Sequence, residues 1–143
     1  MKANNQSEQP KRATISSCGY DFALPYDVVF KPNVWVEIDT GVRFDGREKF
    51  LPKTERWFML VAPRSGLGMK YGMRFANTVG IIDQDYRDNI MARVTVDKEV
   101  HLNKGERFMQ GVFLPYLLLT NESTPTEERA GGLGSTDKKG EEE

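Results

Sequence analysis

The sequence predicts an all-β domain, an antiparallel sandwich or barrel with one short helix. Apolar residues recur with the two-residue period of strands in several short runs, and Gly and Pro interrupt the chain at frequent intervals. Helical periodicity is almost absent. The one plausible helix opens near Ser65 and runs toward Tyr71, and Gly66, Gly68 and Gly72 limit its stability.

The predicted strands follow from where the alternation lies. In the first run Val34, Val36 and Ile38 share one face, and in the third run Ile90 and every second residue after it are apolar. The last run is apolar on both faces and should be covered on both, inside a sandwich or by another subunit. The runs are 34–39, 57–62, 90–96 and 108–119.

Composition divides the chain into three parts. We expect a flexible polar segment at 1–12, one β domain at 13–119, and a flexible C-terminal arm at 120–143, where Glu, Thr, Gly, Lys and Ser dominate. At 143 residues and 16.3 kDa the chain is long enough for one domain with a real core.

Charge and composition exclude several function classes. The formal net charge of −1 gives no general attraction to nucleic acid or to an anionic membrane, and no apolar run is long enough to span a bilayer. The single cysteine, Cys18, agrees with a reducing, cytoplasmic setting. With His101 as the single histidine, a multi-histidine metal cage is excluded and little room remains for a Ser-His-Asp triad. Any catalysis must rest on carboxylates.

Residues 77–86 are the most informative segment. They set an apolar, hairpin-like run, with Ile81 and Ile82, against Asp83, Asp85 and Tyr86. Carboxylates beside a tight backbone segment and a flat ring suggest a small-molecule site with a base and a stacking surface. Taken alone, the segment also fits a solvated Asp-rich turn.

Two segments suit phosphate. Arg64 supplies a bidentate cation, and Ser65 and Gly66 open the predicted helix, although an ordinary N-cap explains them equally well. Residues 131–136 offer glycines and hydroxyls that can wrap an anion, but they lack the features of a P-loop and also fit a flexible linker.

Two polar residues near strands complete the candidates. Gln110 is polar inside an apolar run and needs a partner if it is buried, which neighbouring backbone can supply. Asp21 precedes a strand and can reach a metal directly or through water, or serve as a plain turn residue.

The order of these segments is distinctive. The five segments resemble the five motifs of the trimeric deoxyuridine triphosphatases, in the order and with the spacing of that family. They are 18–21, 63–68, 77–86, 105–110 and 131–136.

The resemblance implies a jelly-roll-like fold and a homotrimer with three active sites at subunit junctions. It also implies hydrolysis of dUTP to dUMP and pyrophosphate, with Mg2+ on the triphosphate, which keeps uracil out of DNA and supplies dUMP for dTMP synthesis. Asp83 would be the base that activates a water for attack on the α-phosphorus, and Tyr86 would stack on the deoxyribose. Asp21 would hold the hydrated Mg2+.

The remaining roles implied by the resemblance are contacts to the base and to the phosphates. Asn77 and the backbone around Ile81, Ile82 and Met91 would form the uracil pocket. The arm would close over the bound nucleotide. The phosphate and arm contacts would be Arg64, Ser65, Gly66, Gln110, Arg129, Gly132, Leu133, Gly134, Ser135 and Thr136.

Four positions depart from the family pattern. Leu133 replaces the usual phenylalanine over the uracil, and Ala130 leaves Arg129 one position closer to the Gly-Gly pair. Asp137 replaces the final glycine of the last motif, and Asp88 replaces the glycine that commonly follows Tyr86 by two positions. At position 88 the turn can be kept, because Asp tolerates a positive φ better than most residues. The alternatives are a dCTP deaminase of the same fold and a dUTP-sensing binding protein that regulates a protein partner.

Overall fold

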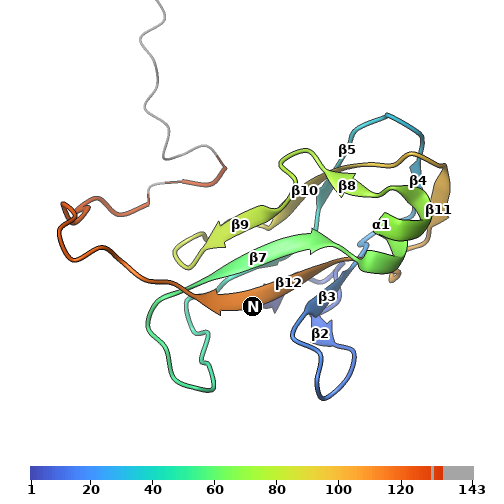
Figure 1. Cartoon of the computed structure of the whole chain (residues 1–143). Coiled ribbons are helices and arrows are strands. Elements are labelled where there is room, and N and C mark those ends of the chain that lie inside the picture. The colour runs from blue at the N-terminus through green and yellow to red at the C-terminus, as the bar shows by residue number, and fades with distance from the viewer. Residues whose placement is uncertain (130, 134–143) are drawn as a thin grey trace, which may run out of the picture.

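The computed structural model describes residues 1–129 and 131–133, and Figure 1 shows their path. Thirteen elements follow one another along the chain. They are β1 (Lys2–Ala3), β2 (Lys11–Arg12), β3 (Tyr20–Ala23), β4 (Val28–Phe30), β5 (Val36–Asp39), β6 (Val42–Arg43), β7 (Trp57–Pro63), α1 (Ser65–Tyr71), β8 (Arg74–Phe75), β9 (Gly80–Asp83), β10 (Met91–Thr95), β11 (Val100–Leu102) and β12 (Arg107–Pro115).

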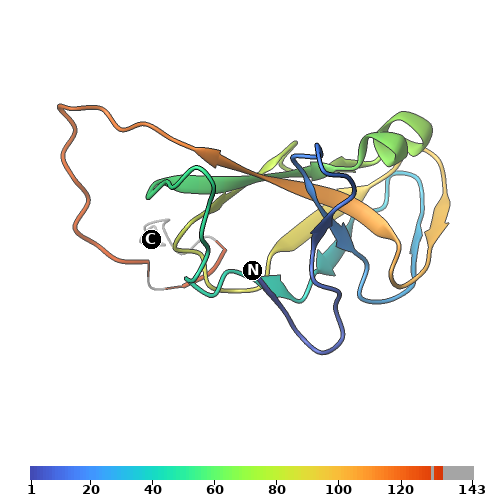
Figure 2. The same cartoon turned by 90° about the horizontal axis from the view of Figure 1, so that it is seen from below.

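The strands form an antiparallel, two-layered fold. The largest sheet has the order β2-β3-β12-β7-β9, a second has the order β5-β10-β8, and β1-β6 and β11-β4 are pairs. Figures 1 and 2 show β7 and β12 in one layer and β5 and β10 in the other. The core lies between them, where Met59 and Val61 of β7 meet Ile38 and Val94, all at most 1% exposed. The predicted all-β, jelly-roll-like class is confirmed.

The strand patterns hold with three differences. In the last run, β12 ends at Pro115, and Leu117 and Leu119 beyond it are 96% and 74% exposed rather than covered on both faces. Ile90 and the three apolar residues that alternate after it are buried, but Thr95 between them is buried as well. Val34 is 50% exposed because β5 begins only at Val36. A turn precedes it, in which Asn33 has a φ of 59° and Val34 N–H donates to the Lys31 carbonyl.

The predicted helix is confirmed as α1. Arg64, rather than Ser65, is its N-cap residue, and no side chain caps it. Gly72 ends the helix in the left-handed conformation, with a φ of 66°, and its N–H donates to the Gly68 carbonyl. A residue without Cβ is favoured at this position because a side chain there would strain the backbone.

An aromatic cluster closes one end of the core. Phe113 of β12 lies 5.0 Å from Phe50, 5.3 Å from Trp57 and 5.7 Å from Tyr20, measured between ring centroids. Edge-to-face contacts of this kind stabilise beyond the apolar area that they bury. The cluster ties β3, β7 and β12 to the loop 44–56.

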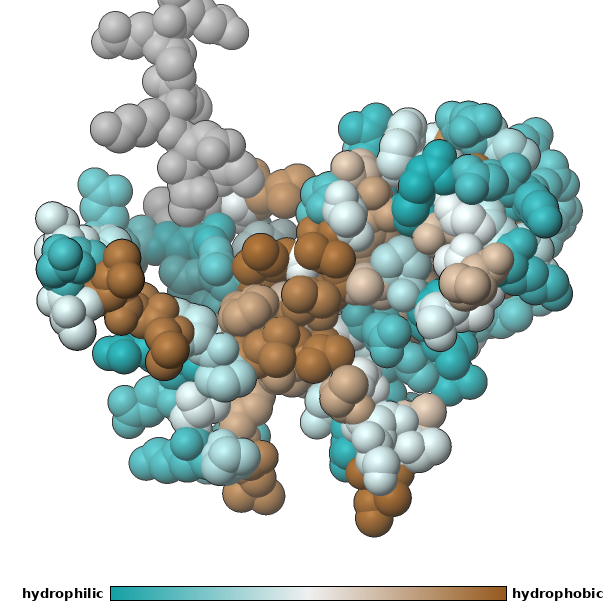
Figure 3. Space-filling model, viewed as in Figure 1, coloured by the Kyte–Doolittle hydropathy of each residue, from teal (hydrophilic) through white to brown (hydrophobic). Residues whose placement is uncertain are grey.

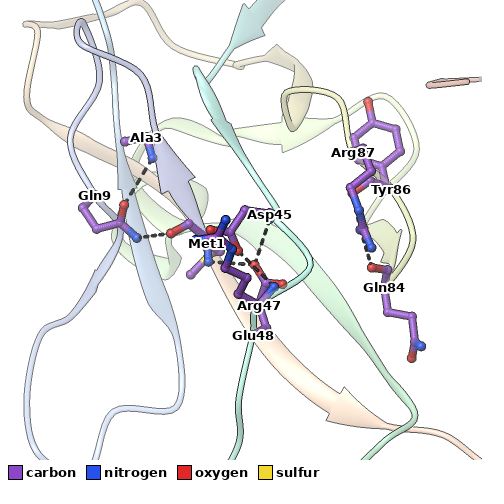
Figure 4. A network of polar contacts seen from close by, with 9 residues as sticks. All are labelled: Met1, Ala3, Gln9, Asp45, Arg47, Glu48, Gln84, Tyr86 and Arg87. Carbon is purple, nitrogen blue, oxygen red and sulfur yellow. Dashed lines mark hydrogen bonds and ion pairs between the residues drawn. The ribbon is translucent and has the colours of Figure 1, made fainter.

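Residues 1–12, for which the sequence predicted flexibility, contribute two short strands. β1 pairs with β6 and β2 pairs with β3. The Met1 amino group lies 2.8 Å from Glu48 Oε1, and both groups are only 5% exposed (Figure 4). Flexibility of this segment stays a prediction. Within the described ranges, no helix has the length and hydropathy needed to cross a membrane.

Candidate active site

A large cavity lies beside the start of β12, where this strand pairs with β3 and with the end of β7. Its volume is about 940 Å³. Gln110 of β12 pairs with Asp21 of β3 on one side and with Ala62 of β7 on the other, so three separate motifs converge. The cavity is lined by Asp21, Arg64, Ser65, Gly66 and Gln110, which are the predicted metal and phosphate residues outside the arm.

Gly19 makes room for Gln110 in this cavity. A Cβ on Gly19 would lie 2.5 Å from Gln110 Oε1 and 3.3 Å from Gln110 Cβ. Only glycine therefore fits at position 19 while the Gln110 side chain keeps its position. The Gln110 side chain is half-buried and lines the cavity, so its amide is available to a ligand.

Asp21 is held between two arginines. Arg64 Nε lies 3.2 Å from Asp21 Oδ1, and Arg107 Nη1 lies 3.0 Å from Asp21 Oδ2, with the Asp21 side chain 9% exposed. Arg107 also lines the cavity, although it has no role among the residues predicted from the sequence. The one sequence feature that could have indicated Arg107 is its positive charge at the start of an otherwise apolar strand. Paired guanidinium groups around one carboxylate suit a polyanionic ligand.

The segment 77–86 follows a tight turn, in which Phe75 and Thr78 form an antiparallel bridge, and then crosses from the second sheet to the largest one. β9 pairs with β7, whereas the next strand, β10, pairs with β5 and β8. Ile81 is 65% exposed, and Ile82, its neighbour in the strand, packs against the core. The side chains of adjacent strand residues point to opposite faces of the sheet. A ligand beside β9 can therefore contact both Ile81 and Ile82 only through their backbone atoms.

Asp83 ends β9 and begins a braced turn. The Trp57 N–H donates to Gln84 Oε1 at 3.1 Å. Within the turn, Arg87 Nη1 donates to the carbonyls of Gln84 at 2.7 Å and of Tyr86 at 3.2 Å (Figure 4). The Trp57 bond joins the turn to the start of β7, and the Arg87 bonds brace the turn internally. The Asp83 carboxylate itself stays exposed.

Tyr86 is the buried residue of this turn, 7% exposed. Its hydroxyl donates to the Asn89 carbonyl at 3.1 Å. Burial raises the pKa of the Tyr86 phenol above its ordinary value, and the negative charge of Asp88 adds to this effect. The ring therefore stays neutral and offers an apolar surface.

A second cavity, about 450 Å³, lies beside this ring. Tyr86, Met91 and Leu133 line it together with Asp39 and Asp88. Arg129 contacts Asp83 and Asp85 nearby. The predicted arm residues Gly134, Ser135 and Thr136 lie outside the described residues.

The candidate residues therefore form two separate groups. Asp83 pairs with Phe58 near the start of β7, and Arg64 lies six positions further along the chain, just past the end of that strand. At about 3.3 Å per residue, six positions separate the two groups by roughly 20 Å. Asn77, exposed in the turn before β9, lies toward the Arg64 end because Gly80 pairs with Val61.

Comparison with known proteins decides the family. The dUTPase family model matches residues 5–137. The chain belongs to the dUTPase family.

Relatives of this dUTPase chain are similar over most of their length. Deoxyuridine 5'-triphosphate nucleotidohydrolase of Lactococcus lactis is 38% identical over 136 residues, which cover 89% of this chain and 86% of the relative. The enzyme of the same name from Nautilia profundicola is 33% identical, with 96% of each chain covered.

Solved dUTPase structures share the fold. The dUTPase of Streptococcus mutans superposes with a TM-score of 0.65 at 28% identity, over 82% of this chain and 96% of that one. A dUTPase of Staphylococcus bacteriophage 80alpha reaches a TM-score of 0.69 at 19% identity, over 89% and 96%, and at that identity it supports the fold alone.

The donor set around Asp21 fits a hydrated Mg2+ ion. In the part of the chain that the structure describes, no three His, Cys, Asp or Glu side chains gather around one point. Mg2+ usually keeps several waters and takes one or two carboxylates together with substrate phosphates. Asp21, facing a cavity with two arginines, meets that requirement.

Proposed function

We propose that this protein hydrolyses dUTP to dUMP and pyrophosphate, which would keep uracil out of DNA and supply dUMP for dTMP synthesis. The observation that carries the proposal is the convergence of Asp21, Arg64 and Gln110, from three separate motifs, in one cavity of a dUTPase-family chain. A triphosphate requires cations and hydrogen-bond donors around it, and this cavity offers two guanidinium groups and an amide.

Asp83 is proposed as the general base. Its carboxylate is exposed at the end of β9, and the Gln84 and Arg87 bonds fix the turn behind it. In the proposed reaction Asp83 takes a proton from the water that attacks the α-phosphorus. The bond between the α-phosphorus and the bridging oxygen breaks, and pyrophosphate leaves.

The other proposed contacts select the nucleotide. Tyr86 stacks on the deoxyribose, where a 2′-hydroxyl would clash, and Asn77 with the backbone at Ile81, Ile82 and Met91 reads the uracil. The phosphates are bound by Arg64, Ser65, Gly66 and Gln110, and the arm residues Arg129 and 132–136 close over them. Ile81 and Ile82 point to opposite faces, which supports recognition through the backbone.

Asp21 is proposed to hold Mg2+ through water. When bound, the metal would neutralise charge on the triphosphate and orient it. Asp21 now accepts bonds from Arg64 and Arg107. Phosphate oxygens that take these two guanidinium groups leave the carboxylate free to hold the metal's waters.

The proposed assembly is a homotrimer with sites at the subunit junctions. The roughly 20 Å between Asp83 and Arg64 along β7 is too long for one α-phosphorus to meet both within one chain. Figure 3 shows an apolar patch over β7, β9 and β12. By the sheet register its side chains include Leu60, Ile81 and Val112. A second copy that covers such a patch removes apolar area from water.

The cytoplasmic location also remains a proposal. Cys18 is exposed and unpaired, which supports a reducing compartment. The net charge of −1 gives no support to direct nucleic-acid binding.

Pyrophosphate release from each deoxynucleoside triphosphate, with Mg2+ and with a chelator, tests the function. We expect turnover that requires Mg2+ and is selective for dUTP. Equal turnover of dTTP or dCTP would contradict the specificity. Ammonia release from dCTP would identify a deaminase instead, and tight dUTP binding without turnover would identify a nucleotide-sensing protein.

A further inference from the structure

The cavity at Asp21 continues past that residue into a smaller one. The smaller cavity, the side cavity, has a volume of about 370 Å³, against about 940 Å³ for the larger cavity. Ala13, Asp21, Gly105 and Arg107 line both of them. The two cavities therefore adjoin along the ion pair between Asp21 and Arg107.

Strand β2 places a lysine beside Asp21. Lys11 of β2 pairs with Asp21, and Asp21 pairs with Gln110 of β12. Residues directly opposite one another in antiparallel strands have their side chains on the same face, with Cβ atoms about 5 Å apart. Lys11 lines the side cavity, and within the described chain it forms no ion pair. Its ammonium group is therefore available to an anion on the face that carries Asp21.

Arg12, the next residue, holds the loop that joins β2 to β3. Its Nη1 atom donates to the carbonyls of Ile15 at 2.9 Å and of Ser17 at 3.0 Å. Inside the loop the hydroxyls of Thr14 and Ser17 lie 2.7 Å apart, and each accepts the backbone N–H of the other residue. Because Arg12 braces the loop, Lys11 and Arg107 are the cations best placed for a ligand in the side cavity.

Two carboxylates, those of Glu8 and Asp21, also line the side cavity. A Cβ on Gly105 would lie 3.1 Å from Glu8 Oε1, so the Glu8 carboxylate lies against this glycine. Carboxylates repel a bare polyanion. They suit a polyanion that carries Mg2+, because this ion keeps several waters and is bound by one or two carboxylates together with phosphate oxygens.

We propose that the side cavity receives the pyrophosphate product as its Mg2+ complex. Lys11 and Arg107 contact the phosphate oxygens, and Glu8 and Asp21 accept hydrogen bonds from the waters on the metal. The inference rests on the proposed dUTPase function, in which the bond between the α-phosphorus and the bridging oxygen breaks and pyrophosphate leaves. Since Arg107 and Asp21 border both cavities, the product keeps these two contacts as it moves from one cavity to the other.

The size and the walls of the side cavity favour pyrophosphate over dUMP. Its volume lies near the lower end of the range of roughly 300–1,000 Å³ for small-molecule sites, which matches a ligand without a base or a sugar. Among the described residues, none of those proposed to contact the uracil or the deoxyribose lines it. β2 is one edge of the largest sheet and β9, which carries Asp83, is the other.

Calorimetric titration of the ligand-free full chain with pyrophosphate, in Mg2+ and in chelator, tests the site. We expect binding that is tighter with Mg2+. Lys11→Met should weaken it about two- to fivefold, the effect of one partly exposed ion pair. Lys53→Met, at an exposed lysine of the 44–56 loop, is the matched control and should leave binding unchanged. Equal weakening in both variants, or no binding of pyrophosphate with Mg2+, would overturn the inference.

Replacement of Glu8 by Gln distinguishes the metal complex from the bare anion. Loss of the carboxylate should weaken binding of the Mg2+ complex about two- to fivefold, because the waters on the metal lose an acceptor. The same change should tighten binding of pyrophosphate in chelator, because a repelling charge is removed. A change in the same direction under both conditions would contradict the proposed mode of binding.

Replacement of Ser65 by Ala distinguishes the side cavity from the larger one. Ser65 lines only the larger cavity, so this change should raise the KM for dUTP and leave the Kd of pyrophosphate within about twofold. Lys11→Met should do the reverse, raising the inhibition constant of pyrophosphate while the KM for dUTP stays within about twofold. If Lys11→Met raised both constants by the same factor, the two ligands would share one site and the inference would be wrong.

The calorimetric measurement needs no turnover, so it separates this inference from the proposed function. Turnover of dUTP without binding of pyrophosphate would overturn this inference alone. Binding of pyrophosphate without turnover of dUTP would overturn the proposed function.

Discussion

Asp83 and Arg64 lie at opposite ends of strand β7. Asp83 pairs with Phe58 near the beginning of the strand, whereas Arg64 follows Pro63 at its end. A reaction that needs both groups at one phosphorus atom therefore needs two copies of the chain. This relationship joins the proposed chemistry to the proposed assembly, and it makes the site sensitive to substitutions in either half.

Replacement of Asp83 by Asn should nearly abolish turnover and leave dUTP binding within a few-fold of wild type. The amide keeps the shape of the carboxylate but cannot take the proton of the attacking water, a contribution worth about 10²- to 10⁴-fold. Single-turnover kinetics and calorimetric titration with dUTP measure the two effects. A variant that keeps the wild-type kcat would show that another group is the base.

Replacement of Asp21 by Asn should raise the Mg2+ concentration for half-maximal activity by roughly 10- to 100-fold, the usual cost of weakening a metal's partners. The carboxylate between Arg64 and Arg107 is lost, and a neutral amide holds a hydrated cation less well. Pyrophosphate release is measured against Mg2+ concentration. Asp97→Asn, at an exposed pair with Arg74, is the control, and an equal shift there would remove the case for Asp21.

Replacement of Gly19 by Ala should raise the KM for dUTP about tenfold. The added methyl group would lie 2.5 Å from Gln110 Oε1, so the Gln110 side chain must leave its position in the cavity. Initial rates give KM and kcat. The control is Gly68→Ala in α1, where a Cβ meets only the Met73 carbonyl at 3.7 Å. That change should stabilise the helix by about 0.5–1 kcal/mol without affecting KM, and a wild-type KM in Gly19→Ala would contradict the role of this glycine.

Replacement of Phe113 by Ala should lower the free energy of unfolding by about 3 kcal/mol, at the lower end of Phe-to-Ala changes because the ring is half-buried. The Phe113 ring packs against the rings of Phe50, Trp57 and Tyr20. Its removal therefore leaves a cavity where the strands meet the 44–56 loop. Urea unfolding followed by tryptophan fluorescence measures the change. Ile15→Ala, at a residue 92% exposed, is the control and should change it by less than about 0.5 kcal/mol. Equal values for both variants would show that the cluster adds little to stability.

Local periodicity predicted much of the fold because it depends only on neighbours in the chain. The alternation from Ile90 to Val96 and the helix from Ser65 to Tyr71 are both present. Thr95 departs from the alternation because it is fully buried on the other face of its strand, and no two-residue period records that burial. Arg107 escaped notice for a similar reason, since only strand pairing brings it to Asp21.

By itself, the sequence determined the all-β class, the short helix and the residue types of the candidate site, because strand alternation, helix-limiting glycines and ordered motifs are properties of neighbouring residues. Tertiary structure alone decided how those residues are grouped. Strand register brings Asp21, Arg64 and Gln110 into one cavity and carries Asp83 to the far end of β7. Tertiary structure also brings Arg129 into contact with Asp83 and Asp85, although Asp85 lies 44 positions earlier in the chain. The strand register and the position of the segment that carries Arg129 both depend on contacts between residues far apart in the chain, and no local pattern encodes such contacts.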